Sequence, residues 1–369
     1  MALRPTLTKR LPSLSTLSLR THSTSVSANE VTHFSALASS WWDPMGSSRV
    51  LHLMNPLRHD FIASCLADGL PAPSYSSPSS SSPNNLRYLD VGCGGGIFAE
   101  SLARTIPSSS SSSSQTQPTS PEASASTATP TRAASITAID PTPQLIQIAR
   151  DHARTDPKVA AHLSSGKFQY RNCTLEDLVR AYQQAQTSSP SPHSQPQPQP
   201  QPQNQFDIVT LFEVLEHIDT NATSSPLRFL TDCLRLLRPG GWLIGSTISR
   251  SLPAFLVNQV IAEAPWPIGV VPRGTHDWAK FVNPEELRGW AREGLLASTS
   301  STGPTSSGSG SGSGSGSAAT ATTTQNINSR SATMQWKCSG VMYFPGIGWK
   351  IVSGSENWGN YFWAVRKGL

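Results

Sequence analysis

The sequence has few charged residues and no long apolar run. Asp, Glu, Lys and Arg make up 14% of the chain, against roughly 25% in an ordinary globular domain. No stretch approaches the roughly 18 consecutive apolar residues that cross a bilayer, which excludes an integral membrane protein. The five cysteines are odd in number and contain no C-x-x-C pair. They argue against a disulfide framework or a zinc finger and for a reducing compartment.

Acidic residues are missing from the N-terminal end, where the first one is Glu30. The basic residues before it are Arg4, Lys9, Arg10 and Arg20. A basic amphipathic helix without carboxylates is attracted to anionic membranes and to a negative-inside potential. We therefore expect residues 1–29 to be a mitochondrial presequence, with a disordered basic tail as the alternative. Because the presequence carries most of the net charge of +5, nothing indicates a nucleic-acid partner.

Four internal stretches have compositions that cannot build a core. They are rich in Ser, Thr, Pro, Gln or Gly, and they span residues 71–85, 107–135, 187–205 and 297–332. We expect all four to be disordered inserts. The rest of 30–369 has the length of one domain.

Strands and helices alternate in this remaining chain. Apolar runs predict strands at 86–91, 135–140, 168–173, 206–212 and 242–248, with a helix after each of the first four. The alternation indicates an α/β fold with a parallel, doubly wound sheet. Two aromatic-rich runs, 341–344 and 361–365, are expected to close the sheet as an antiparallel hairpin, which gives seven strands.

A glycine-rich turn follows the first strand, in the sequence Asp90-Val-Gly92-Cys-Gly94-Gly-Gly. Glycine is needed where backbone approaches a ligand closely or takes a positive φ. The dinucleotide-binding fingerprint G-x-G-x-x-G/A does not match, because its last position is Ile97 in this sequence. Asp140 ends the second strand. When the insert is left out, the spacing from Gly92 to Asp140 is close to the roughly 20 residues expected between a glycine turn and a ribose-binding acid. The pattern favours S-adenosylmethionine, with a tight turn that binds no ligand as the alternative. The candidate cofactor contacts are Asp90, Gly92, Gly94 and Asp140.

Two carboxylates and an imidazole follow the fourth strand, at Glu213, Glu216 and His217. In a helix, positions i, i+3 and i+4 lie on one face, so a helical segment would bring the three groups together. Such a set suits Mg²⁺, Mn²⁺ or Zn²⁺, and the metal would lower the pKa of a bound catechol. Two alternatives stay open: His217 is a general base that the carboxylates orient, or the carboxylates cap a helix and contact the cofactor.

An apolar segment at 252–271 follows the fifth strand and is interrupted by Pro265 and Pro267. It is too short and too broken to span a bilayer. We expect it to lie over the mouth of the site as a lid. There it either dips into a membrane interface to admit a lipid-like substrate or packs on the protein as a substrate cap.

Several motifs are more specific than the glycine turn. They are Trp41-Trp42-Asp43, Asn55-Pro-Leu-Arg58 and Gly274-Thr-His-Asp277. The first belongs to a longer stretch, 34–43, and the last to 272–281, and these two stretches act together with 89–97 and 213–217. With these motifs the chain resembles the ubiquinone-biosynthesis O-methyltransferase family, the mitochondrial polyprenyldihydroxybenzoate and demethylubiquinol methyltransferases. The resemblance implies the Rossmann-like fold of class I S-adenosylmethionine-dependent methyltransferases.

The resemblance also implies roles for individual residues. It implies that S-adenosylmethionine is contacted by Arg58, Gly92, Asp140 and Phe212. It also implies that a divalent metal, with Mg²⁺ as the first candidate, is bound by Glu213, Glu216 and His217. The implied substrate is a polyprenylated catechol or hydroquinol, and the implied location is the matrix face of the mitochondrial inner membrane, within a multi-subunit biosynthetic complex. A methyltransferase for another small phenol and a non-catalytic methyltransferase-like subunit are the competing interpretations.

Overall fold

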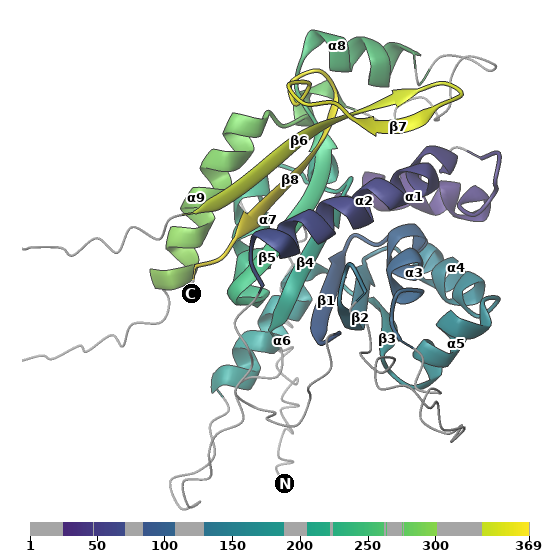
Figure 1. The fold of residues 1–369 in the computed structure, drawn as a ribbon, viewed down its shortest axis with the longest axis vertical. Coiled ribbons are helices and arrows are strands. Elements are labelled where there is room, and N and C mark those ends of the chain that lie inside the picture. The colour runs from purple at the N-terminus through teal and green to yellow at the C-terminus, as the bar shows by residue number, and fades with distance from the viewer. Residues whose placement is uncertain are drawn as a thin grey trace, which may run out of the picture.

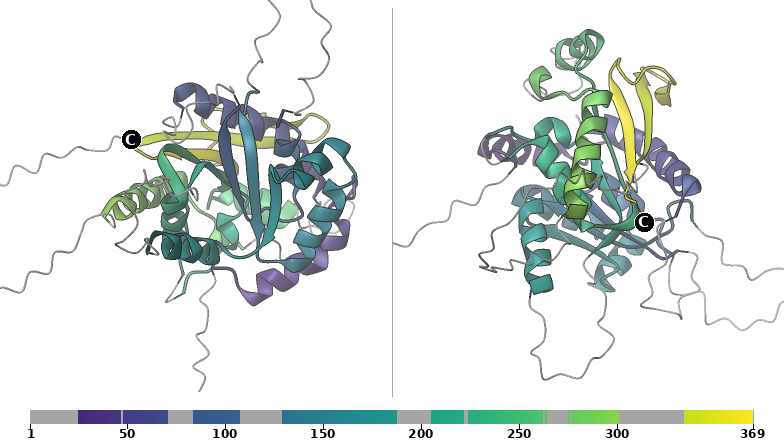
Figure 2. Two further views of the ribbon diagram at one scale, coloured as in Figure 1. Left: turned by 90° about the horizontal axis from the view of Figure 1, so that it is seen from below. Right: turned by 90° about the vertical axis from the view of Figure 1, so that its left-hand side faces the viewer.

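An eight-stranded mixed sheet forms the centre of the molecule, with helices on both faces (Figures 1 and 2). The computed structural model describes residues 25–46, 48–70, 84–107, 129–187, 205–221, 224–261, 263, 275, 277–300 and 334–368. The strand order is β3-β2-β1-β4-β5-β8-β6-β7. Neighbours from β3 to β5 are parallel, and β8, β6 and β7 are added antiparallel. The predicted α/β fold with a mostly parallel sheet is confirmed.

The bounds of the elements are as follows. The strands are β1 (Leu86–Val91), β2 (Ala133–Asp140), β3 (Phe168–Asn172), β4 (Phe206–Phe212), β5 (Leu237–Ile248), β6 (Gln335–Phe344), β7 (Gly348–Ile351) and β8 (Asn360–Arg366). The α-helices are α1 (Ala28–Leu37), α2 (Arg49–Asp68), α3 (Ile97–Ala103), α4 (Pro143–Ala153), α5 (Pro157–Ser164), α6 (Leu175–Thr187), α7 (Pro226–Leu236), α8 (Leu252–Ala254) and α9 (Pro284–Ser300). Short helical turns are η1 (Ala38–Ser40), η3 (Leu215–His217), η4 (Phe255–Ile261) and η5 (Trp278–Lys280).

The sheet separates two apolar cores, and β8 shows how the chain supplies both. Tyr361, Trp363 and Val365 belong to the core shared with α6, α7 and α9. Phe362 and Ala364 belong to the core shared with α2, α3, α4 and α5. Because successive side chains of a strand point to opposite faces, a continuous apolar run fits a strand that is covered on both sides.

Parallel pairing brings three strand ends to one edge of the sheet. Asp90 of β1 lies opposite Ala138 of β2 and Thr210 of β4. The loops that follow β1, β2 and β4 therefore meet at this edge, and the starts of the same strands lie at the other. In an open parallel sheet, ligands bind beyond the carboxyl ends of the strands.

Parts of the predicted inserts belong to the fold. β2 begins at Ala133, two residues before the predicted strand, where it pairs with Leu86 of β1. Just before it, the carbonyl of Thr131 accepts a hydrogen bond of 2.5 Å from the buried Tyr88 hydroxyl. The side chain of Asn84 accepts from both the N–H and the hydroxyl of Thr129. α9 continues to Ser300. Predicted insert boundaries at 85, 135 and 297 are therefore wrong, and most of the other insert residues lie outside the described ranges.

Residues 25–29, which the sequence places in the presequence, also pack on the domain. The N–H of Ser25 donates to Glu176 at 2.9 Å, and its carbonyl accepts from the N–H of Asp219 at 3.0 Å. Ser27 then caps α1 by accepting from the N–H of Glu30. This cap starts a helix inside a stretch whose Ser-rich composition gave no helical signal. The rest of the predicted presequence lies outside the described residues.

The sheet closes antiparallel as predicted, but with a different register. β8 pairs with β5 and with residues 335–340 of β6. Residues 341–344 pair instead with β7, a strand that the sequence analysis did not predict. Gly346 and Gly348, with φ of 80° and 87°, allow the tight turn that joins these two strands. The sheet therefore has eight strands rather than seven.

Candidate active site

The glycine turn after β1 lies closely against its neighbours. Gly92 and Gly94 have φ values of 70° and 52°, where only glycine is unstrained. A Cβ on Gly95 would approach Cδ1 of Trp41 to 2.3 Å, so the indole leaves no space for a side chain there. The N–H groups of Gly92 and Cys93 donate to the carbonyl of Ile139. The turn is thus held between β2 and the segment that follows α1.

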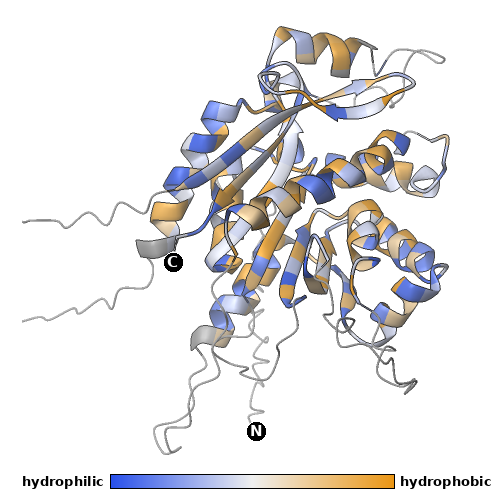
Figure 3. Cartoon of the chain, viewed as in Figure 1, coloured by the Kyte–Doolittle hydropathy of each residue, from blue (hydrophilic) through white to orange (hydrophobic). Residues whose placement is uncertain are grey.

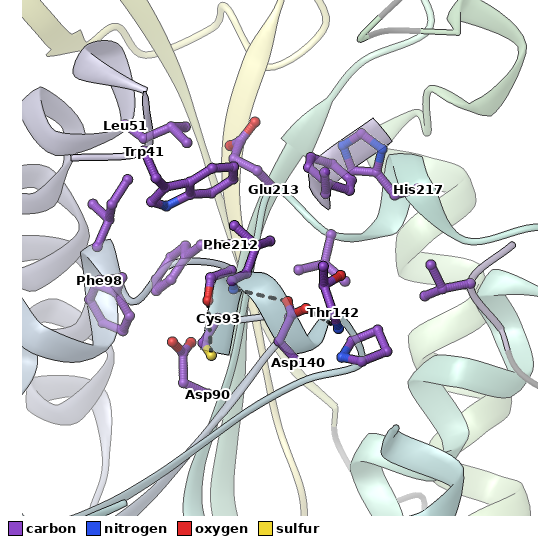
Figure 4. A pocket seen from close by; sticks show the side chains of 18 of the residues that line it. Trp41, Leu51, Asp90, Cys93, Phe98, Asp140, Thr142, Phe212, Glu213 and His217 are labelled. Atoms are coloured by element: carbon purple, nitrogen blue, oxygen red, sulfur yellow. Dashed lines mark hydrogen bonds between the residues drawn. The ribbon is translucent and has the colours of Figure 1, made fainter. Parts of the chain in front are cut away.

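Two buried carboxyl groups, Asp90 and Asp140, lie at the ends of β1 and β2 (Figure 4). Asp140 accepts from the N–H of Gly94 at 2.9 Å and from the N–H of Thr142 at 2.8 Å. Asp90 accepts from the Thr210 hydroxyl at 2.6 Å. Burial raises the pKa of both groups, and that of Asp90 reaches about 7. A ligand that brings a positive charge or hydroxyl donors would favour their ionised forms.

Arg58 of α2 is a buried cation in the same region, with 3% of its surface exposed. One guanidinium nitrogen donates to Asn55 at 3.0 Å, and the group lies 4.9 Å from the Phe212 ring centroid. Its Nε is buried without a hydrogen-bond partner. Burial lowers the pKa of Arg58, and nearby carboxylates act in the opposite direction. Among the described residues, however, no carboxylate forms an ion pair with the guanidinium. A buried, unpaired guanidinium is suited to an anionic group of a ligand.

These groups line one hollow of about 910 Å³, part of which is open to solvent. All residues predicted to contact the cofactor line it: Arg58, Asp90, Gly92, Gly94, Asp140 and Phe212. Figure 4 shows Phe212 between Phe98 and Glu213, and the two phenyl rings meet edge to face with centroids 4.6 Å apart. The structure therefore brings the predicted cofactor residues together.

The segment after β4 is not the helix that would bring Glu213, Glu216 and His217 onto one face. Glu213 has φ of 56°, and only one 3₁₀ turn, η3, follows it. The Glu213 carboxylate accepts from Ser246 at 2.6 Å and from Asn360 at 3.3 Å. The positive φ interrupts the helical path, so the predicted helical spacing does not apply.

Glu216 and His217 consequently point to different surroundings. Glu216 is buried and accepts from the Thr247 hydroxyl at 2.8 Å. Burial and the adjacent Glu213 carboxylate raise the pKa of Glu216 well above its usual range. His217 lines the hollow, and its Nδ1 lies 3.2 Å from a carboxylate oxygen of Glu30 in α1. Figure 4 shows Glu213 and His217 on separate sides of the hollow.

The predicted three-ligand metal set does not fit this arrangement. In the part of the chain that the structure describes, no group of three or more His, Cys, Asp or Glu side chains is placed to hold a metal ion. The two carboxylates lie together, but the imidazole is held by Glu30 instead. Glu213 and Glu216 do not cap a helix either, since their oxygens bind side chains of β5 and β8.

Sequence reasoning missed several residues that shape the hollow. Phe34 and Trp41 line it, and Glu30 and Lys280 contact each other beside it. Phe34, Trp41 and Lys280 belong to stretches that carried the family resemblance, which was the only available signal. Glu30 belongs to no such stretch, and the helix that positions it was not predicted.

Comparisons with known proteins agree with this geometry. A family model described as a methyltransferase domain matches residues 58–294. The ubiquinone biosynthesis O-methyltransferase of Alkalilimnicola ehrlichii is 34% identical over 278 residues, which is 75% of this chain and 81% of that protein. The mitochondrial ubiquinone biosynthesis O-methyltransferase of Schizosaccharomyces pombe is 33% identical over 269 residues, which is 73% of this chain and 72% of that protein.

A solved structure is also similar. It is the N-methyltransferase NodS from Bradyrhizobium japonicum WM9 in complex with S-adenosyl-L-homocysteine, which is 12% identical with a TM-score of 0.41. The similarity covers 92% of this chain and 97% of that one. This degree of likeness is too low to add to the family match.

The raised pKa of Asp90 predicts a pH-dependent stability. Between the usual value of 3.8 and about 7, the folded state holds a proton that the unfolded state has lost. The free energy of unfolding therefore falls as the pH rises through this window. Asp90→Asn removes the effect, so its stability relative to the wild type should increase by about 2 kcal/mol between pH 5 and pH 8. Urea unfolding at both pH values measures the difference.

Asp156→Asn is the control for this measurement. The Arg104 side chain lowers the pKa of Asp156 from its usual value of 3.8. The stability linked to Asp156 is therefore lost only when the pH falls below about that value. The difference between Asp156→Asn and the wild type should then stay constant from pH 5 to pH 8. A constant difference for Asp90→Asn as well would contradict the raised pKa.

Proposed function

Because the chain belongs to the family of ubiquinone biosynthesis O-methyltransferases, we propose that it methylates a phenolic hydroxyl of a polyprenylated substrate. The methyl donor is S-adenosylmethionine. The acceptors are polyprenyl-dihydroxybenzoate and demethylubiquinol, as the sequence analysis expected. The observation that carries the proposal is the unpaired, buried Arg58 guanidinium beside the glycine turn and the two strand-end carboxyls, all facing one hollow.

The residues of the hollow fit S-adenosylmethionine group by group. Arg58 supplies a charge-assisted donor for the carboxylate of the methionine moiety. Asp140 keeps acceptor capacity for ribose hydroxyls, since each of its oxygens receives one backbone N–H. Gly92 and Gly94 line the hollow, and without side chains they let a ligand approach the backbone. When bound, the cofactor supplies a methyl group on a positively charged sulfur, which an oxygen nucleophile can attack.

His217 is the residue best placed to accept the proton of the acceptor hydroxyl. A phenol has a pKa near 10 and is a weak nucleophile until it loses its proton. The imidazole lines the hollow, and its neutral form carries one lone pair. The ring nitrogen with this lone pair would take the hydroxyl proton and leave a nucleophilic phenolic oxygen. The cofactor, held by Arg58 and Asp140, would supply the methyl group that this oxygen accepts.

A methylation assay tests the proposal. Purified protein with S-adenosylmethionine and short-chain analogues of both acceptors should give O-methylated product and S-adenosylhomocysteine, which mass spectrometry detects. Product from unprenylated catechols alone would instead favour a methyltransferase of another small phenol. Cofactor binding without any product would favour a non-catalytic subunit. Absence of cofactor binding would overturn the proposal.

The matched variant for this assay is Arg58→Met, which keeps the side-chain packing but removes the charge. Loss of one charge-assisted hydrogen bond costs about 1.5–3 kcal/mol, so affinity for S-adenosylmethionine should fall by roughly 10- to 100-fold. The ligand-free variant should be no less stable than the wild type, because an unpaired buried charge is unfavourable. Arg154→Met, at the exposed position directly after α4, should change neither property.

The divalent metal stays a prediction of the sequence analysis. Glu213 and Glu216 are the two members of the predicted set that lie together, and His217 is the member that does not join them. The prediction requires turnover in the same assay to disappear on treatment with EDTA and to return with Mg²⁺. Turnover that is unchanged by EDTA would contradict the prediction of a metal. No step described above depends on the metal.

A mitochondrial location is consistent with the relatives named as mitochondrial in Schizosaccharomyces pombe and Candida albicans. We propose that the protein binds peripherally to the matrix face of the inner membrane. No helix among the described residues is long and apolar enough to cross a membrane. Membership of a multi-subunit complex stays a prediction. Support for membrane contact comes from exposed apolar side chains on α8 and η4: Leu252, Phe255, Leu256, Val257 and Val260.

Figure 3 colours several residues of this helical segment as hydrophobic, and the segment lies at the same end of the molecule as the turn between β6 and β7. Leu252 and Leu256 are 78% and 52% exposed. In water such surface is unfavourable, and an interfacial helix buries it among lipid chains. The described part of the predicted lid, 252–261, therefore favours the membrane-interface alternative over a cap packed on the protein.

Replacing Leu252 and Leu256 together by Glu should weaken binding to vesicles of phosphatidylcholine and cardiolipin. Loss of two buried leucines costs at least about 3 kcal/mol, so the partition coefficient should fall more than roughly 100-fold. Sedimentation with vesicles measures it. Leu296→Glu, on α9 and also exposed, is the control for added charge. Equal losses in both proteins, or no loss in either, would contradict this membrane contact.

A further inference from the structure

A carboxylate from the N-terminal helix contacts the imidazole of the site. Oε2 of Glu30 lies 3.2 Å from Nδ1 of His217, across a sequence separation of 187 residues. Both side chains are shielded, with exposed fractions of 18% and 14%. The sequence analysis considered Glu213 and Glu216 as the groups that orient His217. Their carboxylates are instead taken up by Ser246, Asn360 and Thr247.

Glu30 is itself fixed from a third part of the chain. Its other oxygen accepts from Nζ of Lys280 at 3.0 Å, and Lys280 also donates to Asp219 at 2.8 Å. Burial works against ionisation of Glu30, but the hydrogen bonds and charges of His217 and Lys280 outweigh it and lower its pKa to about 2. Glu30 is therefore a carboxylate at neutral pH, with each oxygen occupied by one partner.

The helix that carries Glu30 also holds the ring from a second direction. Phe34 lies one turn further along α1, on the same face as Glu30. Its ring meets that of His217 edge to face, with centroids 4.9 Å apart and an interplanar angle of 81°. α1 therefore supplies both an ionic contact to one edge of the imidazole and an apolar contact to the ring. Together they restrict its position and its rotation.

The contact with Glu30 fixes which ring nitrogen carries the hydrogen. A carboxylate only accepts hydrogen bonds, so the hydrogen in this bond belongs to Nδ1. In the neutral ring the lone pair is then on Nε2. The hydrogen bonds that described residues make to this ring involve Nδ1, and the ring lines the hollow. Nε2 is thus the nitrogen left for a ligand.

We propose that Glu30 is a positioning residue, which holds His217 so that the lone pair of Nε2 faces the hollow where the acceptor hydroxyl binds. This inference rests on the proposed function for its effect on turnover, but its effect on the imidazole does not. Lys280 and Asp219 complete the arrangement by keeping Glu30 in place. A carboxylate that orients an imidazole in this way is a general device for setting its tautomer.

The competing explanation is that Glu30 only fastens α1 to the domain. The same helix has a second fastening at its start, where the N–H of Ser25 donates to the side chain of Glu176. Glu176 does not contact His217. Glu176→Ala therefore loosens the attachment of α1 while it leaves the contact between Glu30 and His217 in place. It is the matched control for Glu30→Ala.

The test compares Glu30→Ala, Glu30→Gln and Glu176→Ala in the full chain. Loss of a group that orients an imidazole costs roughly 10- to 100-fold, so Glu30→Ala should lower kcat by that factor with little change in the KM for S-adenosylmethionine. Glu30→Gln retains an acceptor for Nδ1–H and should recover kcat to within about tenfold of the wild type. Glu176→Ala should keep the wild-type kcat.

A spectroscopic readout separates this inference from the proposed function. In ¹⁵N NMR spectra of histidine-labelled protein, with His217→Gln to assign the signal, the neutral ring should carry its hydrogen on Nδ1. The signal of Glu30→Ala should shift toward the Nε2–H form, and that of Glu176→Ala should not. An unchanged tautomer in Glu30→Ala, or equal losses of kcat in Glu30→Ala and Glu176→Ala, would overturn the inference. If the wild type methylates neither acceptor, the proposed function is wrong. The NMR measurement of the His217 tautomer would then still show whether Glu30 orients the ring.

Discussion

The parallel pairing of β1 with both β2 and β4 is the constraint on which the site depends. It brings the carboxyl ends of three strands to one edge of the sheet, so that Asp90, Asp140 and Phe212 line one hollow although they are far apart in the sequence. The hydrogen bond from the N–H of Gly94 to Asp140 then ties the glycine turn to the neighbouring strand. The part of the hollow proposed to hold the cofactor therefore depends on this topology.

Buried charge is concentrated at this edge and is incompletely compensated. Arg58 has no ion-pair partner among the described residues, and Asp90 and Glu216 are buried carboxyls whose pKa values are raised. Each of these groups makes the folded state less stable than an apolar replacement would. Arg58 and Asp90 line the same hollow, and perturbed ionisable groups that share a hollow are typical of functional sites. A ligand with a carboxylate, a positive centre and hydroxyl groups would relieve this strain, and S-adenosylmethionine has all three.

Local patterns predicted the glycine turn with Asp90 and Asp140, and the family resemblance added Arg58 and Phe212, whereas the surroundings of His217 needed the structure. Runs of apolar residues identified β1 and β4 with their observed bounds, because a buried parallel strand is continuously apolar. The helical spacing assumed for Glu213 and His217 failed, because the positive φ of Glu213 interrupts the backbone path. The partner of His217 was not predictable from spacing at all, since Glu30 comes from a helix that begins beside the basic N-terminal stretch. Such long-range contacts depend on how the elements pack.

The two halves of this hollow should hold a methyl donor and a phenol side by side. A crystal structure of the wild-type protein with S-adenosylhomocysteine and a short-chain catechol analogue tests this arrangement most directly. We expect the ligand carboxylate at the guanidinium of Arg58, the ribose at Asp140, and the phenolic oxygen within hydrogen-bonding distance of Nε2 of His217. A cofactor carboxylate bound away from Arg58, or a phenolic oxygen that does not reach His217, would contradict it.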